Sequence, residues 1–405
     1  MRILIAPDKF KGALNAREVS EHLAAGIHMA LPDAQIDIVP MADGGEGTAE
    51  TICNSLGGSW VECKARDPIG REIAARYAWI DDEKLAVMEM SEAAGLRRLQ
   101  PNEYNPDRAS TFGVGEMILD AAKRGARKII VGLGGSATND GGFGMARALG
   151  FGFFDEQREL TGAMSDLQKL TRIIPPSLRT LRPPRDHDRV ERRENEGESN
   201  PLKVFRAALP KISAAVDVRN PLFGENGATR VFGPQKGVTE DKISLFEASL
   251  AKLADVVAKE FGRDFRNEHG AGAAGGLGFG LMSFCNACMR PGFDVVAEAV
   301  DLESKMKAVD IVITGEGSLD RQTLNGKTPA GVAHLAKKLG KPVYAIAGRA
   351  EDDKELHKMF SKIFVVAEPG LSESENMARA AELLEQRGRE LGGHCKASPE
   401  NKVDG

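Results

Sequence analysis

Short apolar runs with the length of buried strands occur near both ends of the chain. Amphipathic stretches separate them, and the first begins at Asn15, after which Val19, Leu23 and Ile27 recur on one helical face. The strand-like runs are residues 2–6, 36–39, 309–314, 342–347 and 363–367. This alternation predicts βαβ units and a parallel sheet built from both chain ends.

The middle of the chain has a different pattern. Two strand-like runs, residues 60–65 and 73–80, flank the turn-forming sequence ARDPIGRE and predict an antiparallel hairpin. We therefore expect an α/β fold with a Rossmann-like or flavodoxin-like parallel-sheet domain, residues 1–58 and 292–392. A second α/β domain with a mixed sheet, residues 59–291, is inserted into it. We expect a charged surface loop near residues 175–202 and a disordered tail at 393–405, because neither stretch has much to bury.

Composition narrows the class of protein. A chain of 405 residues is long for one core, and 42% hydrophobic with 28% charged residues is typical of a globular protein. The net charge of -5 argues against a general binder of nucleic acids or of anionic membranes. No apolar run has the length of a membrane span, and the odd set of five cysteines fits reduced thiols, so we expect a cytoplasmic protein. Cys285 and Cys288 form a CxxC without a second pair, which does not complete a zinc site.

The stretch after the apolar run 309–314 carries the densest set of polar candidates. Gly315 and Gly317 predict that the strand ends and a loop begins, and ligands of open α/β sheets bind at such strand ends. Two acids there, Glu316 and Asp320, can hold a divalent cation. The other polar candidates in this loop are Gln322, Thr323, Asn325 and Lys327.

The next helix is predicted to start with Thr328 as N-cap and Pro329 at the first helical position, and to end at Gly340. Lys327 therefore lies beside a helix N-terminus, where free N–H groups favour an anion, and the pattern predicts a site for phosphate and its metal ion. The resemblance of Gly326, Lys327 and Thr328 to a P-loop fails, because Arg321 stands where that motif needs glycine. The alternative is an ordinary polar connection.

Two earlier strand ends carry acids next to glycines. Asp8, Lys9 and Lys11 follow the first strand, and Asp43 and Glu46 follow the second. If these strands are parallel neighbours, both loops lie on the same edge of the sheet.

The sequence GLGGSATNDGG, residues 132–142, follows another predicted strand. Its glycines allow backbone N–H groups to converge on an anion, although its spacing is not the dinucleotide fingerprint. The candidates in it are Gly134, Gly135, Ser136, Thr138 and Asn139. A tight structural turn is the alternative.

Two further features lie later in the chain. Asp217 follows a strand at 212–216. A third glycine cluster, residues 270–280, fits either close backbone packing or a ligand cleft.

Seven stretches together resemble the bacterial glycerate kinase family, in order from the N-terminus to about Gly370. They are APDKFKGAL, PMADGGEGT, GGSATNDGG, DVRNPLFGENGA, VFGPQKG, GAGAAGGLG and TGEGSLDRQTLNGKTPAGVA. The resemblance implies transfer of the γ-phosphate of ATP to D-glycerate with Mg²⁺, most often giving 2-phosphoglycerate, and two α/β domains with a cleft between them. Two departures are a longer charged insertion near 178–200 and Lys9 where serine is common.

Within that resemblance we assign roles as hypotheses. Lys9, Lys11 and Lys327 would neutralise phosphate, and the glycine-rich loop 132–142 would hold phosphate or the glycerate carboxylate. Gln322 and Thr323 would contact the nucleotide. The expected magnesium ligands are Asp43, Glu46 and Glu316. Asp217 and Asp320 lead as the base that accepts the hydroxyl proton, with Asp8 behind them.

Three rival functions differ from this reading. Glycerate 3-kinase activity, or a kinase for another small hydroxy acid or sugar, would use the same scaffold. A nonenzymatic ligand-binding protein has less need for so many acids beside phosphate-type loops, and an NAD-dependent oxidoreductase lacks its GxGxxG pattern. We expect small-molecule substrates, no nucleic-acid or membrane partner, and leave the oligomeric state open, a homodimer included.

Overall fold

The computed structural model describes residues 1–177, 200–321 and 323–397. Most of the predicted charged loop, the tail from 398 and Gln322 lie outside the described residues. The chain forms two compact units. Unit 1 consists of Met1–Asp43 and Pro291–Gly405, and unit 2 of Gly44–Arg290.

Unit 1 contains a five-stranded sheet in the order β13-β12-β11-β1-β2, and every pairing in it is parallel. Its strands are β1 (Arg2–Ile5), β2 (Gln35–Ile38), β11 (Ile311–Leu319), β12 (Val343–Ala350) and β13 (Lys362–Val365). The chain winds in one direction from β1 to β2 and in the other from β11 to β13. The switch point therefore lies between β1 and β11, which is where open α/β sheets bind ligands.

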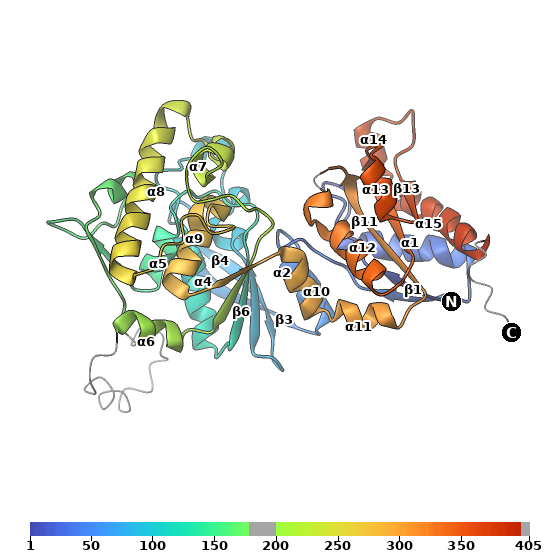
Figure 1. The fold of residues 1–405 in the computed structure, drawn as a ribbon, viewed down its shortest axis with the longest axis horizontal. Helices are drawn as coiled ribbons and strands as arrows, with labels where there is room; N and C mark the ends of the chain where they lie inside the picture. Colours follow the sequence, from blue (N-terminus) through green and yellow to red (C-terminus); the bar gives the residue numbers. More distant parts are fainter. Residues whose placement is uncertain (178–199, 322, 398–405) are drawn as a thin grey trace. The chain divides into compact units, whose positions relative to one another are not determined.

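Helices flank this sheet. They are α1 (Ala16–Ala30), α10 (Gly292–Ala299), α11 (Leu302–Lys307), α12 (Thr328–Lys338), α13 (Lys354–Met359), α14 (Glu373–Ala378) and α15 (Ala380–Ala397). The predicted start of α1 is confirmed as a capping box of Asn15 and Glu18. α1 and α15 lie side by side (Figure 1), and a Cβ on Gly26 would stand 2.1 Å from the carbonyl oxygen of Glu385. α15 continues through residues 393–397, which we expected to be disordered, and Cys395 in this part is buried.

Unit 2 contains a six-stranded sheet in the order β10-β9-β6-β5-β4-β3. Its strands are β3 (Ser59–Arg66), β4 (Glu72–Ile80), β5 (Leu85–Glu89), β6 (Lys128–Gly132), β9 (Lys211–Ala215) and β10 (Cys288–Arg290). β10, β9, β6 and β5 are parallel, whereas the predicted hairpin of β3 and β4 is antiparallel. The expected α/β fold with one parallel and one mixed sheet is thus confirmed. A separate antiparallel pair, β7 (Gly152–Phe154) and β8 (Arg172–Ile174), was not predicted.

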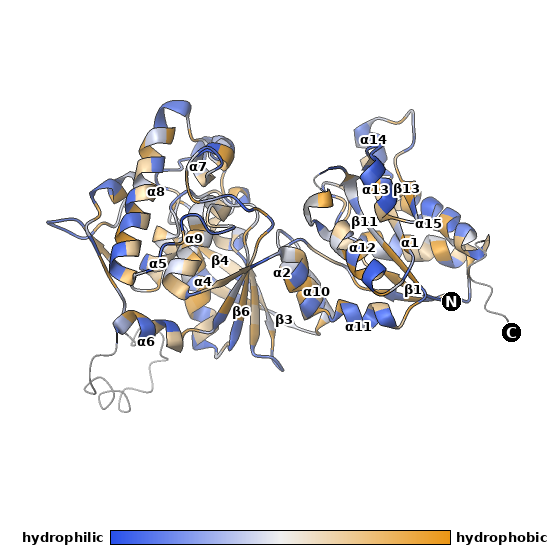
Figure 2. Ribbon diagram, viewed as in Figure 1, coloured by the Kyte–Doolittle hydropathy of each residue, from blue (hydrophilic) through white to orange (hydrophobic). Residues whose placement is uncertain are grey.

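The helices of unit 2 pack around its sheet. They are α2 (Thr48–Ser55), α3 (Ser91–Ala94), α4 (Phe112–Lys123), α5 (Phe143–Ala148), α6 (Pro201–Ala208), α7 (Ala228–Phe232), α8 (Glu240–Phe261) and α9 (Ala273–Cys285). α2 contacts β4 and β5, so residues 44–58 belong with unit 2 although we expected them in the first domain. α6 begins at Pro201, one residue before the expected loop end at 202, because Asn200 caps it. Figure 2 shows hydrophilic and hydrophobic positions alternating along α8, as its predicted amphipathic pattern requires.

The glycine cluster 270–280 lies at the start of α9 and packs against residues 138–142. A Cβ on Gly275 would stand 1.9 Å from the Thr138 carbonyl oxygen, and one on Gly280 would stand 2.7 Å from the Gly142 Cα. Of the two readings left open, the structure shows close backbone packing. None of the helices in the described ranges has both the length and the hydropathy needed to cross a bilayer.

Candidate active site

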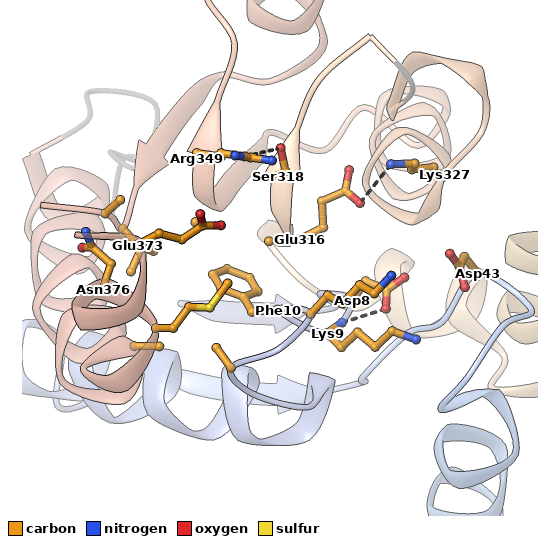
Figure 3. Close-up of a pocket in the computed structure, with 18 residues that line it drawn as sticks. Asp8, Lys9, Phe10, Asp43, Glu316, Ser318, Lys327, Arg349, Glu373 and Asn376 are labelled. Carbon is orange, nitrogen blue, oxygen red and sulfur yellow. Dashed lines mark hydrogen bonds and ion pairs between the residues drawn. The ribbon is translucent and has the colours of Figure 1, made fainter. Parts of the chain in front are cut away.

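A cavity of about 670 Å³ opens at the carboxyl ends of the unit 1 strands. Figure 3 shows Phe10 near its middle, with Asp8, Asp43 and Lys327 to one side and Glu373 and Asn376 to the other. The charged lining includes Asp8, Lys9, Lys11, Asp43, Glu316, Lys327 and Arg349. The apolar lining includes Phe10, Ala13, Val366, Met377 and Ala380. The volume is within the usual range for a small-molecule site, and the two kinds of lining suit a ligand with an anionic and an apolar part.

Asp8 is a buried carboxyl group at the end of β1. Its Oδ2 accepts a hydrogen bond from Thr328 Oγ1 at 2.8 Å, and its Oδ1 accepts one from the Lys9 backbone at 2.7 Å. Burial and then the charge of Asp43 raise the pKa of Asp8 to about 6, although both hydrogen bonds act in the opposite direction. The two hydrogen bonds therefore do not offset the cost of burying the ionised form of Asp8. Carboxyl groups with such a raised pKa are typical of functional sites.

Glu316 lies on the neighbouring strand, across the switch point from Asp8. We expected a loop from Gly315, but β11 continues to Leu319 because Glu316 pairs with Ala347 and Ser318 with Arg349 on β12. Pairing with a long neighbour outweighs the weak strand preference of the glycines. Glu316 Oε1 accepts a hydrogen bond from Thr323 Oγ1 at 2.5 Å.

The electrostatics of Glu316 match those of Asp8. Burial, followed in smaller measure by the charges of Asp8 and Asp320, raises the pKa of Glu316 to about 7, against the effects of Thr323 and Lys327. Lys327 Nζ lies 3.9 Å from Glu316 Oε2, with its side chain 30% exposed. Buried acids with raised pKa values beside a lysine form a site suited to a cation and an anion together.

The start of α12 differs from the predicted one. Lys327 is the N-cap, Thr328 and Pro329 are the first two helical residues, and the Thr328 hydroxyl bonds to Asp8. Thr328 thus connects the α12 N-terminus to β1 instead of capping its own helix. The predicted end is close to the observed one, with Gly340 at φ +67 just beyond Leu339.

The predicted magnesium ligands are divided between the units. Asp43 and Glu316 line the unit 1 cavity, whereas Glu46 belongs to unit 2 and lies 3.5 Å from Arg97 Nη1. Among the described residues there is no group of three or more His, Cys, Asp or Glu side chains that could hold a metal. The cavity instead offers pairs of acids. Mg²⁺ bound with a nucleotide commonly takes only one or two carboxylates, together with phosphate oxygens and water.

Asp320 and Thr323 organise the segment that follows β11. The Asp320 backbone N–H donates to Thr323 Oγ1 at 3.2 Å, and Thr323 N donates to Asp320 Oδ1 at 3.3 Å. Thr323 is fully buried, so its hydroxyl orients Glu316 from behind and does not line the cavity. Gln322 lies outside the described residues.

The candidates of the glycine-rich loop lie together at the carboxyl end of β6 in unit 2. Ser136, Thr138 and Asn139 are buried, and Asn139 Nδ2 donates to Thr229 Oγ1 of α7 at 3.0 Å. Asp217 follows β9, which pairs with β6 through Ala215 and Gly132. The predicted loop and Asp217 therefore stand at the ends of adjacent parallel strands.

Three side chains with a role at these sites were missed from the sequence. Thr328 contacts Asp8, Arg349 lines the cavity and donates to Ser318 Oγ at 3.1 Å, and Lys236 lies under the glycine-rich loop. Lys236 lies in VFGPQKG, one of the stretches that carry the family resemblance. Its place in that stretch is the sequence signal that could have identified Lys236.

The chain matches known proteins over nearly its whole length. The model of the Glycerate kinase family matches residues 3–184 and 201–396. A glycerate kinase of Halalkalibacterium halodurans is 38% identical over 96% of this chain and 97% of that protein. The glycerate 2-kinase of Escherichia coli is 40% identical over 87% of this chain and 86% of that protein.

A solved structure agrees with these relatives. The crystal structure of a glycerate kinase 2 from Salmonella typhimurium superimposes with a TM-score of 0.83 at 35% identity, covering 98% of both chains. The similarity thus includes both sheets and the strand ends that carry the candidate residues. On these matches the chain belongs to the glycerate kinase family.

Proposed function

We propose that this chain is a glycerate kinase that transfers the γ-phosphate of ATP to D-glycerate with Mg²⁺ and forms 2-phosphoglycerate. The observation that carries the proposal is the juxtaposition of Asp8, Glu316 and Lys327 at the switch point of the unit 1 sheet. Family membership supports the reaction, and the name of the Escherichia coli relative, glycerate 2-kinase, favours the C2 hydroxyl as acceptor.

The acids of the cavity fit a divalent cation. Asp43 raises the pKa of Asp8, and Asp8 in turn raises the pKa of Glu316, so a bound positive charge would relieve a repulsion that the protein otherwise retains. One or two of Asp8, Asp43 and Glu316 would hold Mg²⁺, since no three acids of the described residues are grouped closely enough to bind it together. When bound, the ion offsets charge on the phosphate oxygens during transfer.

The lysines and the apolar lining suggest how ATP lies in the cavity. Lys9, Lys11 and Lys327 would bind the phosphates, and Lys327 does so beside the N-terminus of α12. Phe10, Val366 and Met377 offer apolar surface for the base at the opposite side. Lys327 is already within reach of Glu316, so nucleotide and cation binding would depend on each other.

The proton of the glycerate hydroxyl needs an acceptor near the transferred group. Asp217 and Asp320 remain our candidates, because Asp8 would be engaged with the cation. Asp320 also orders the segment after β11, so its replacement would affect Thr323 and Glu316 as well.

Phosphorus NMR of the purified protein with Mg²⁺, ATP and D-glycerate tests the proposal. We expect a 2-phosphoglycerate resonance that grows as the ATP γ-phosphate resonance declines. A 3-phosphoglycerate resonance would retain the kinase and correct the acceptor hydroxyl. Absence of any phosphoglycerate, with ATP intact, would overturn the proposal.

A further inference from the structure

Lys236 is a buried lysine of unit 2, and its charged form would be favoured by a nearby anion. It ends the short 3₁₀ helix η6 (Pro234–Lys236) and is only 2% exposed. Its ammonium donates to Ser136 Oγ and to the Thr138 carbonyl oxygen, both at 2.7 Å. Within the described ranges, no carboxylate forms an ion pair with it. A buried ammonium that has only neutral partners is costly, and such groups are retained where their charge is used.

Burial lowers the pKa of Lys236 to about 7, and the charge of Asp140 opposes this shift, but the Asp140 oxygens are already engaged. They accept from the Thr111 backbone at 2.9 Å, the Thr111 hydroxyl at 2.9 Å, Gly142 N at 3.0 Å and Gly144 N at 3.0 Å. Asp140 therefore fixes the turn into α5. The charge of Lys236 is left without a direct counter-charge.

The loop that Lys236 supports presents backbone donors. In the described part of the chain, the N–H groups of Gly134, Gly135 and Ser136 donate to no protein acceptor. Gly135 has φ +70 and is exposed, and a Cβ on Gly134 would stand 2.9 Å from the Gly45 Cα. No side chain can thus cover these donors at either glycine without strain or collision.

Buried hydroxyl and amide groups adjoin the same loop. Ser91 Oγ, Thr138 Oγ1 and Asn139 Oδ1 have no hydrogen-bond partner among the described residues. Ser91 begins α3 at the end of β5, and Gly95 just after α3 forms a β-bridge with Ser136. The two hydroxyl groups can donate to a ligand with acceptor oxygens, whereas the Asn139 oxygen can only accept.

We propose that the Gly134–Ser136 backbone binds the carboxylate of the acceptor substrate, and that Lys236 is the positioning residue that holds these donors and places a positive charge behind them. This inference rests on the proposed function, which supplies glycerate as the acceptor. One buried ammonium matches the single charge of a carboxylate, whereas the nucleotide phosphates have three lysines in unit 1.

Steady-state kinetics of Lys236→Met, with Lys242→Met as the matched control on the exposed side of α8, tests the assignment. We expect the KM for D-glycerate to rise about 10- to 100-fold, as for loss of a charge-assisted interaction, while the KM for ATP stays within about twofold. Ser136→Ala keeps the ammonium and its bond to Thr138, and should raise the same KM by less than about tenfold.

Glyceramide, in which a neutral amide replaces the carboxylate, separates charge recognition from simple damage to the loop. We expect Lys236→Met to lose most of the preference of the wild-type protein for glycerate over glyceramide. Equal losses for both substrates, or an unchanged KM for glycerate in a folded variant, would overturn the inference. If Lys236→Met does not fold, an unaltered KM in Ser136→Ala would count against it.

Calorimetric titration of D-glycerate without ATP distinguishes this inference from the proposed function. A wild-type protein that makes no phosphoglycerate would refute the kinase proposal. Binding of glycerate that is weakened by Lys236→Met and not by Lys242→Met would still support the carboxylate site. Equal binding by all three proteins would refute it.

Discussion

The unit 1 cavity and the unit 2 glycine-rich loop both lie at carboxyl ends of parallel strands, but they hold positive charge in different ways. In unit 1, Lys9, Lys11 and Lys327 line the cavity themselves, and acids stand beside them. In unit 2, Lys236 is buried and reaches the surface only through Ser136 and the backbone. The first arrangement suits a highly charged ligand that arrives with a cation. The second suits a small anion that is recognised by position.

Because of this difference, the two sites should respond to substitutions in different ways. Removing a charge from the cavity should alter the binding of nucleotide and metal directly, because solvent and ligand both reach the side chains. Substitution of Lys236, which supports the glycine-rich loop, should act through the orientation of the loop's N–H groups. Variants in unit 1 therefore test whether its charges contact the ligand directly.

The largest effect is expected for Asp8→Asn. The amide keeps the shape and can still accept from Thr328, but it removes a negative charge that would hold the cation, so kcat should fall by about 10²- to 10³-fold. Coupled assays of ADP release measure it. Asp33→Asn, an exposed acid of the same unit, is the control, and equal activity of the two variants would remove Asp8 from the reaction.

Lys327→Met should act mainly on the nucleotide. Loss of its ammonium at the start of α12 should raise the KM for ATP by about tenfold and leave the KM for glycerate within about twofold. Lys338→Met, on the exposed side of the same helix, is the matched control. A selective rise in the KM for glycerate would instead contradict the division of ligands between the two units.

Glu316→Gln should stabilise the protein while it impairs turnover. The folded pKa of Glu316 is raised from 4.5 to about 7, so ionisation of this buried group destabilises the folded protein. The destabilisation is absent below pH 4.5, grows as pH rises from 4.5 to 7 and is complete above about pH 7. We expect the variant to gain on the order of 2 kcal/mol in the free energy of unfolding at pH 8 and almost nothing at pH 4.5. Urea unfolding at both pH values measures this, and a gain at pH 4.5 equal to that at pH 8 would contradict it.

The smallest effect is expected for Thr328→Val, which removes the hydroxyl that stabilises ionised Asp8. Because that hydrogen bond lowers the pKa of Asp8, its loss should move the acidic limb of kcat/KM, expected near pH 6, upward by about one pH unit or less. A pH profile from 5 to 8 detects the shift. Thr328→Ser should retain the wild-type limb, and a shift in both variants would point to helix placement instead.

The strand-end acids illustrate what the sequence could predict. Apolar runs located β1 and β11 and put Asp8 and Glu316 each at the end of a strand. The parallel pairing of these two strands, which the structure shows, brings the two acids to the same edge of the sheet although more than 300 positions separate them. The sequence could not predict that β11 would extend through two glycines, because that depends on its pairing with β12. For the same reason the hydroxyl of Thr328 was assigned to its own helix and not to Asp8.

Lys236 illustrates the opposite case. From sequence a lysine next to glycine in VFGPQKG looks like an exposed turn residue, since lysines are seldom fully buried. Its burial follows from α7 and α9 closing over the 138–142 turn, which involves contacts among distant glycines. No local pattern encodes those contacts.

The insertion of unit 2 into unit 1 determines the order in which a ribosome can deliver the folded parts. Thr314 Oγ1 bonds to the Ala6 carbonyl oxygen across 308 positions, and β1 has β11 as its central neighbour. The apolar strand Ile3, Leu4 and Ile5 must therefore remain without that neighbour for roughly 15 to 60 seconds of synthesis. Unit 2 is continuous from 44 to 290 and can complete its fold within this interval. The nascent chain can thus complete unit 2 before the strands that finish the unit 1 sheet have been made.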